Sequence, residues 1–287
     1  MDFAALQSIV ASDSQSRGAP SLCRPEFLRD ALRLLAEASR AVVVTGFYVQ
    51  KAGAPETDGP PGAVVLGRAL ARAGKDVVLL TDGLNHDALD ACSRSIGGPS
   101  VVRADTPGEV EKEVNKAETG ETTTLIFIER PGHAADGCYY DMKGRDIGAV
   151  AAPLDRAAES ALARGVPVLG VGDGGNEAGM GLLYEELAER LPDYARCLSR
   201  VSATVCLPVD VSNWGGYALA AALSASRSRW LGLDDGEEAA MLEALLRAGA
   251  VDGISGTPSM SVDGIPLSGL NEKNIRIENW YSENFRV

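Results

Sequence analysis

Acidic residues stand beside glycine in four loops that follow segments typical of buried β-strands. These loops contain Asp58, Asp82, Glu129 and Asp173, and Glu177 lies four residues after the last of them. Because the carboxyl ends of parallel strands meet at one edge of a sheet, we expect these side chains to gather there. Carboxylate oxygens are hard ligands that suit Mg²⁺, Mn²⁺ or Ca²⁺, and a cation offsets the repulsion between crowded carboxylates. One such loop is ordinary turn chemistry, so the prediction of a metal site depends on the whole set.

The glycine-rich loop at residues 170–175 allows a second interpretation. It fits the G-x-G-x-x-G pattern of dinucleotide sites, follows a predicted strand and is expected to open a helix. Asp173 and Glu177 would repel a pyrophosphate, however, and phosphate-binding loops favour bare backbone N–H groups at a helix start. A nucleotide-binding oxidoreductase or regulatory module is therefore the alternative from another class. A metal-dependent hydrolase of a small phosphorylated metabolite is a third hypothesis.

The elements that must position these loops alternate between strand and helix patterns. Strands are predicted at residues 41–45, 76–81, 100–103, 122–128, 166–171 and 202–207. Helices are predicted at residues 24–38, 63–73, 85–95, 108–116, 154–163, 215–227 and 237–248, with one more ending near residue 190. This alternation predicts an α/β fold with a mostly parallel sheet, helices on both faces and the active site at the carboxyl ends of the strands. We expect a single domain over residues 1–287, with a smaller lobe from about residue 200 as the alternative.

The composition of the chain argues against some classes of binding partner. The net charge of −13, without a cluster of Lys and Arg, disfavours nucleic acid and anionic membranes. Five scattered cysteines without a CxxC motif indicate reduced thiols. The longest apolar stretch is too short to span a bilayer, and the first thirty residues resemble neither a signal peptide nor a transit peptide. We therefore expect a cytoplasmic protein that acts on a small anionic metabolite, with a homo-oligomer left open.

Several other residues have both a chemical and a structural interpretation. Asn213 precedes an apolar helix and could either cap it or contact a substrate. The turn-rich segment at residues 253–259 could hold a carboxylate through backbone N–H groups, or be a plain loop. Arg130 suits a carboxylate substrate or an internal ion pair equally well. His86 and His133 form no H-x-x-x-H pattern, which disfavours a common zinc site.

Longer motifs connect these residues to a known family. They are E-T-D-G-P-P-G-A at 56–63, E-R-P-G at 129–132, G-V-G-D-G-G-N-E at 170–177, G-M-G at 179–181 and S-N-W-G at 212–215. Together they resemble the D-glutamate cyclase family over roughly residues 20–285. Animal members are mitochondrial and carry an additional N-terminal domain, whereas this chain is similar to a free-standing bacterial-type version. The resemblance implies a lyase that converts D-glutamate to 5-oxo-D-proline and water with Mn²⁺ or Mg²⁺.

Lactam formation needs a proton acceptor for the ammonium group and positive charge near the reacting carboxylate. We therefore predict Asp58, Glu129 and Glu177 as catalytic residues. The predicted metal ligands are Asp58, Glu129, Asp173 and Glu177, with Asp82 in reserve. The predicted substrate contacts are Gly46, Asn176, Asn213, Gly256 and Thr257.

Overall fold

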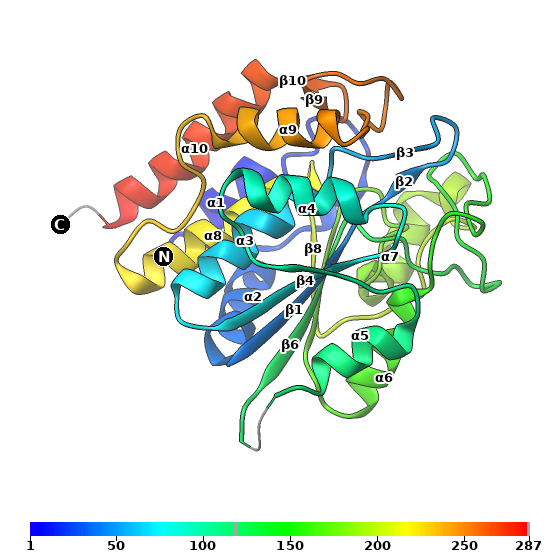
Figure 1. Cartoon of the computed structure of the whole chain (residues 1–287), viewed down its shortest axis with the longest axis horizontal. Coiled ribbons are helices and arrows are strands. Elements are labelled where there is room, and N and C mark those ends of the chain that lie inside the picture. Colours follow the sequence, from blue (N-terminus) through cyan, green and yellow to red (C-terminus); the bar gives the residue numbers. More distant parts are fainter. Residues whose placement is uncertain (118–119, 286–287) are drawn as a thin grey trace.

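The computed structural model describes residues 1–117 and 120–285, which are built around one parallel sheet (Figure 1). Its strands are β1 (Arg40–Thr45), β4 (Asp76–Thr81), β5 (Val101–Arg103), β6 (Thr123–Ile128), β7 (Val168–Gly172) and β8 (Val205–Pro208). They lie in the order β5-β4-β1-β6-β7-β8, and every neighbouring pair is parallel. The chain moves outward from β1 to β5 and then returns to start again at β6. In such doubly wound sheets, ligands bind beyond the strand ends where the order reverses, here between β1 and β6.

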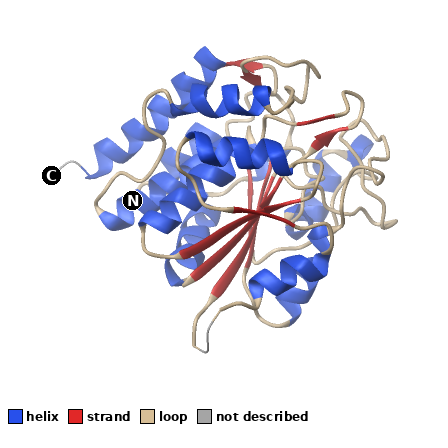
Figure 2. Cartoon of the chain, in the orientation of Figure 1, coloured by secondary structure: helices blue, strands red, loops and turns tan. Residues whose placement is uncertain are grey.

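Helices cover both faces of this sheet (Figure 2). One layer contains α1 (Phe3–Val10), α2 (Pro25–Glu37), α3 (Pro60–Arg72), α4 (His86–Ser95), α8 (Ser212–Arg227), α9 (Glu237–Arg247) and α10 (Leu267–Phe285). The other layer contains α5 (Pro107–Val114) and α6 (Ala157–Ala163). A smaller cluster surrounds α7 (Tyr184–Arg190). These observations confirm the predicted α/β class with a parallel sheet between helices.

The central strands alternate their side chains between the two helical layers. On β1, Val42 and Val44 pack in the cluster that includes α5 and α6, whereas Val43 packs in the cluster of α3 and α8. All residues of β1 and β6 are buried. This explains why these strands appear in the sequence as unbroken apolar runs, as expected for strands covered on both faces.

Short elements complete the chain around the carboxyl edge of the sheet. Two antiparallel hairpins are formed by β2 (Tyr48–Val49) with β3 (Ala54–Pro55), and by β9 (Ser261–Val262) with β10 (Ile265–Pro266). Single 3₁₀ turns occupy η1 (Ala19–Leu22), η2 (Leu154–Arg156), η3 (Met180–Leu183) and η4 (Pro192–Tyr194). Within the described residues, no helix is both long and apolar enough to cross a membrane.

Several elements differ from the sequence expectations: α1 and the two short hairpins were not predicted, and two later helices also differ. The C-terminal α10 was not predicted, because its apolar stripe is sparse: between residues 267 and 284, only Leu270, Ile277 and Trp280 are buried. The helix expected directly after the glycine loop starts late, with η3 at Met180 and the α-helical part at Tyr184. The expectation that this loop opens a helix is therefore wrong.

Candidate active site

The helices α3 and α8 begin side by side at the carboxyl edge of the sheet. Asp58, just before α3, caps the start of α8, and Asn213, in the first turn of α8, caps the start of α3. The Asp58 carboxylate, just before α3, accepts the backbone N–H groups of Ser212 and Asn213 at 2.9 Å each. In return, Asn213 Oδ1 accepts the N–H groups of Gly59 and Gly62 at 2.9 Å each. Asn213 therefore caps α3 rather than its own helix, satisfying donors that an isolated helix leaves unpaired.

Glycines allow this reciprocal capping because the two helices touch backbone to backbone. A Cβ added at Gly216 would lie 2.4 Å from the carbonyl oxygen of Gly62. One added at Gly62 would lie 2.7 Å from the Cα of Asn213. The close approach directs two helix N-termini, with their partial positive charges, towards the Asp58 carboxylate.

Three of the predicted carboxylates meet at this edge. Asp58 precedes α3, Glu129 follows β6 and Asp173 follows β7. All three are buried, and one oxygen from each lies within 4.8 Å of the others. Ser212 Oγ donates to Glu129 Oε2 at 2.6 Å, which orients the central carboxylate.

The backbone at Glu129 is strained. Its φ of 46° is in the left-handed region, which non-glycine residues seldom adopt and which often marks functional sites. Across from it, a Cβ at Gly59 would lie 2.7 Å from Glu129 Cβ, so glycine is needed there. The fold thus accepts local strain to turn the Glu129 side chain into the switch point between β1 and β6.

Burial and mutual repulsion make these carboxyl groups hard to ionise. Burial raises the pKa of Asp58 to about 8, with a further rise from the charge of Asp263, while the capped N–H groups oppose it. Burial, then the charges of Glu177 and Asp58, raise the pKa of Glu129 well above its usual range. The pKa of Asp173 is raised by burial and by Glu129, against the effect of Arg17. The cluster therefore favours bound protons or a bound cation.

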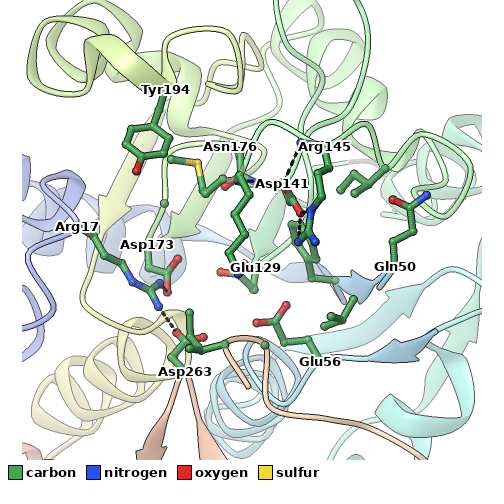
Figure 3. A pocket seen from close by; sticks show the side chains of 18 of the residues that line it. Arg17, Gln50, Glu56, Glu129, Asp141, Arg145, Asp173, Asn176, Tyr194 and Asp263 are labelled. Carbon is green, nitrogen blue, oxygen red and sulfur yellow. Dashed lines mark hydrogen bonds and ion pairs between the residues drawn. The ribbon is translucent and has the colours of Figure 1, made fainter. Parts of the chain in front are cut away.

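Three charged residues that were not predicted as site residues extend the cluster. Arg17 forms ion pairs with Asp173 and, at 3.1 Å, with Asp263 (Figure 3). Glu56 is half-buried, and its pKa is raised well above the usual range by burial and by the nearby charges of Asp263 and Asp58. Across the described residues, no hydrogen bond or ion pair reaches the Glu56 carboxylate.

The sequence contained a detectable sign of only two of these residues. Glu56 lies in the same motif as Asp58. Asp263 belongs to an Asp-Gly pair with positive φ at both residues, which is the usual two-residue turn of a tight hairpin. Arg17 lies in an irregular segment without periodicity, and only the fold brings it to the site.

A cavity of about 410 Å³ opens onto the cluster, a size typical of small-molecule sites. Figure 3 shows Arg17, Asp173 and Asp263 on one side of it, with Glu129 and Glu56 towards the middle. Gln50 and the ion pair between Arg145 and Asp141 lie on the other side in Figure 3, and Lys143 also lines the cavity. The cavity thus joins an acidic region to a rim that carries positive charge, an arrangement that suits a small zwitterion with additional negative charge.

Comparison with known proteins agrees with these features. A family model described as D-glutamate cyclase-like, C-terminal, matches residues 6–277. The chain belongs to this family. It is 31% identical over 310 aligned residues to the human protein named D-glutamate cyclase, mitochondrial. The alignment covers 94% of the chain but only 50% of the human protein, so the chain spans about half the length of that relative.

The acidic cluster of this cyclase-like chain has the chemistry of a divalent metal site. Three buried carboxylates supply hard oxygen donors, and burial together with neighbouring carboxylates raises their pKa values even though Arg17 pairs with Asp173. Asp58 accepts two N–H groups on Oδ1 and one on Oδ2, so Oδ2 retains a free lone pair. The triad of Asp58, Glu129 and Asp173 can therefore hold a metal ion.

Glu177, the fourth predicted ligand, lies against its own loop. Its Oε1 accepts the N–H groups of Asp173 at 3.0 Å and Gly174 at 2.7 Å, and its Oε2 accepts Gly175 N–H at 2.7 Å. The carboxylate thus occupies the donors that a phosphate would use in a dinucleotide loop. Since this loop also lacks an adjoining helix N-terminus, both features disfavour the nucleotide-binding alternative.

Not all of the residues predicted to contact substrate line the cavity. Asn176 lines it, and its Nδ2 donates to Tyr140 O at 2.9 Å. Gly46 does not line it, although the neighbouring Phe47 does. Neither Gly256 nor Thr257 lines it, and their N–H groups donate within their own loop, to Asp252 O and Ser255 Oγ. Substrate contact by these residues stays a prediction.

Asp82 and Arg130 form an internal pair at the end of β4. Arg130 is fully buried and donates to Asp82 Oδ2 at 2.5 Å and to the carbonyl oxygens of Gly46 and Ala152. The Asp82 carboxylate also accepts the N–H groups of Leu84 and Asn85. Asp82 is not part of the triad, and Arg130 serves the structure of the loops around it.

Proposed function

We propose that this chain is a metal-dependent D-glutamate cyclase that converts D-glutamate to 5-oxo-D-proline and water. The observation that supports this most strongly is the buried carboxylate triad at the switch point of the sheet, facing a cavity of about 410 Å³. Membership of the cyclase-like family and the name of the human relative support the choice of substrate.

Asp58, Glu129 and Asp173 would hold the metal, Mn²⁺ or Mg²⁺. When bound, the cation supplies positive charge that makes the γ-carboxylate of the substrate more electrophilic. The helix N-termini that meet at Asp58 add fixed partial positive charge to the same region. The cavity keeps the flexible substrate folded, with its amino group close to its own γ-carboxylate, which removes much of the entropic cost of ring closure.

The chemical step joins the amino nitrogen to the carbon of the γ-carboxylate and breaks the bond from that carbon to one of its two oxygens. Both protons lost from the ammonium group leave on that oxygen as water, so the overall step needs no external acid or base. Glu56 is the carboxylate best placed to carry a proton between them, because it lines the cavity and the described residues leave it without a partner. Asn176, also on the cavity wall, would orient the substrate through its amide group.

The experiment that tests this function uses the purified chain with D-glutamate, and with L-glutamate as the matched control. Chiral chromatography measures 5-oxoproline with Mn²⁺, with EDTA, and after Mn²⁺ is restored. We expect product from D-glutamate, loss of activity with EDTA and recovery with Mn²⁺. Asp173→Asn should reduce turnover by about 100-fold or more while the circular dichroism spectrum stays unchanged. Equal turnover with and without EDTA would refute metal dependence, and no product under any condition would refute the reaction.

A further inference from the structure

Arg17 is a guanidinium placed inside an acidic metal site. Its side chain is only 20% exposed and lines the cavity, pairing with Asp173 on one side and Asp263 on the other (Figure 3). Asp173 is also one of the three carboxylates of the triad. The same carboxylate therefore faces a guanidinium and the position where a divalent cation would bind.

The position of Arg17 is built by the fold. Asp210, which is buried just after β8, accepts Ser12 N–H at 3.2 Å, Ser12 Oγ at 2.7 Å and Asp13 N–H at 2.7 Å. Ser14 Oγ donates to the same carboxylate at 3.1 Å. One buried carboxylate thus holds the segment that immediately precedes Arg17.

The turn around Arg17 is also fixed on its other side. Asp13 Oδ1 accepts the N–H group of Gly18 at 2.9 Å, which closes a short loop around Arg17. Ser16 has a φ of 55° and Gly18 a φ of 84°, so both neighbours of Arg17 have a positive φ, which is uncommon for a serine. A strained turn held in this way supports a functional position for the side chain that it carries.

A guanidinium and a metal ion compete for Asp173 on electrostatic grounds. Both use its oxygens, and two cations a few ångströms apart inside a protein repel each other strongly. Once the metal has taken Asp173, the guanidinium keeps Asp263 but has lost one of its two ion-pair partners. A largely buried cation that loses a partner is costly, so it favours a new anion in the cavity beside it.

We propose that Arg17 is a counter-ion of the metal-free site that gives up Asp173 to the divalent cation and then binds a carboxylate of the incoming amino dicarboxylate. The inference rests on the proposed function for the identity of the substrate, but the competition with the metal does not depend on it. Arg17 then couples the two ligands, because each one favours the arrangement in which the other binds. The planar guanidinium suits this role because two of its N–H groups can bind one carboxylate side by side.

The test compares wild type with two variants. Arg17→Gln removes the charge, whereas Arg17→Lys keeps the charge but removes the pair of parallel N–H donors. Arg29→Gln is the matched control, since Arg29 is an exposed arginine that pairs with Asp30 on α2. Isothermal titration with Mn²⁺ alone measures metal affinity. Steady-state kinetics at saturating Mn²⁺ measure KM and kcat for D-glutamate. Circular dichroism confirms that each variant is folded.

We expect Arg17→Gln to bind Mn²⁺ about tenfold more tightly than wild type, because the competing charge is gone. Arg17→Lys should stay within about threefold of wild type in Mn²⁺ affinity. Both variants should raise KM for D-glutamate by about 10- to 100-fold with a smaller change in kcat, because neither side chain offers the two parallel N–H donors of a guanidinium. Arg29→Gln should change neither quantity.

Equal or weaker Mn²⁺ binding by Arg17→Gln would overturn the proposed competition and indicate that Arg17 only positions Asp173. An unchanged KM in Arg17→Lys would overturn the carboxylate-binding role, even if the glutamine variant does not fold. Failure of the proposed function is a separate result: wild type would bind Mn²⁺ yet form no 5-oxoproline. The Mn²⁺ affinities of the Arg17 variants would still decide the competition.

Discussion

Glu129→Gln should weaken metal binding without lowering the stability of the metal-free protein. Glutamine has nearly the same shape and keeps an oxygen that can accept the Ser212 Oγ hydrogen bond. It removes a charge that burial and the neighbouring carboxylates of Glu177 and Asp58 disfavour, as the raised pKa of Glu129 indicates. We therefore expect the metal-free variant to be at least as stable as metal-free wild type, although it has lost a ligand.

The size of the effect follows from ligand linkage. Mn²⁺ at 100 times its Kd stabilises a protein by about 2.7 kcal/mol. At about 2.1 cal/mol/K per residue, a chain of 287 residues has an unfolding entropy of about 0.6 kcal/mol/K. Wild type should therefore gain about 4–5 °C in Tm. If the variant binds 100-fold more weakly, the same Mn²⁺ concentration adds about 0.4 kcal/mol and less than about 1 °C.

The assay is thermal unfolding of EDTA-treated, dialysed protein with and without added Mn²⁺. Glu177→Gln is the matched control, because the same substitution there disturbs a carboxylate that accepts three backbone N–H groups. We expect it to lower the metal-free Tm by roughly 2–5 °C, from a cost of about 1–3 kcal/mol, and to keep most of the Mn²⁺ shift. A Glu129→Gln variant with a lower metal-free Tm and a full Mn²⁺ shift would refute this reasoning.

Two further predictions concern pH and the paired helix ends. Because the folded-state pKa of Asp58 is raised to about 8, the folded metal-free protein binds more protons than the unfolded chain at intermediate pH. Its stability should therefore fall as pH rises from the ordinary carboxyl range towards 8, while the Mn²⁺-induced Tm shift grows. Unfolding curves at about pH 5.5 and 8.5 measure both trends, and a pH-independent shift would contradict the assignment. Asn213→Ala leaves the N–H groups of Gly59 and Gly62 without their acceptor, so denaturant titration should show a loss of about 1–2 kcal/mol. An unchanged unfolding free energy would show that water replaces the cap.

The sequence was sufficient for features that depend on short-range pattern and on strand polarity. Short runs of mostly apolar residues predict strands buried on both faces, and β1 and β6 are such strands. Parallel strands place their carboxyl ends together, so Glu129 and Asp173 could be assigned to one edge before the strand order was known. The family motifs are likewise local, and the family match supports them.

Tertiary structure decided which acidic residues face one another and which face their own backbone. Glu177 and Asp173 are four residues apart and look equivalent in the sequence, yet Glu177 binds its own loop whereas Asp173 joins the triad. Asp82 is likewise held by Arg130. The direction of a side chain depends on backbone torsions and on competing donors, and the order of residue types does not encode these simply.

Only the tertiary structure revealed that Arg17 and Asp263, from opposite ends of the chain, meet beside the acidic cluster. Their 246-residue separation carries no periodicity that a sequence pattern could express. The contact exists because Asp210, at the end of β8, holds the N-terminal segment beside the C-terminal hairpin. Local preferences therefore determined the sheet and its acidic edge, while long-range packing determined the charges that surround it.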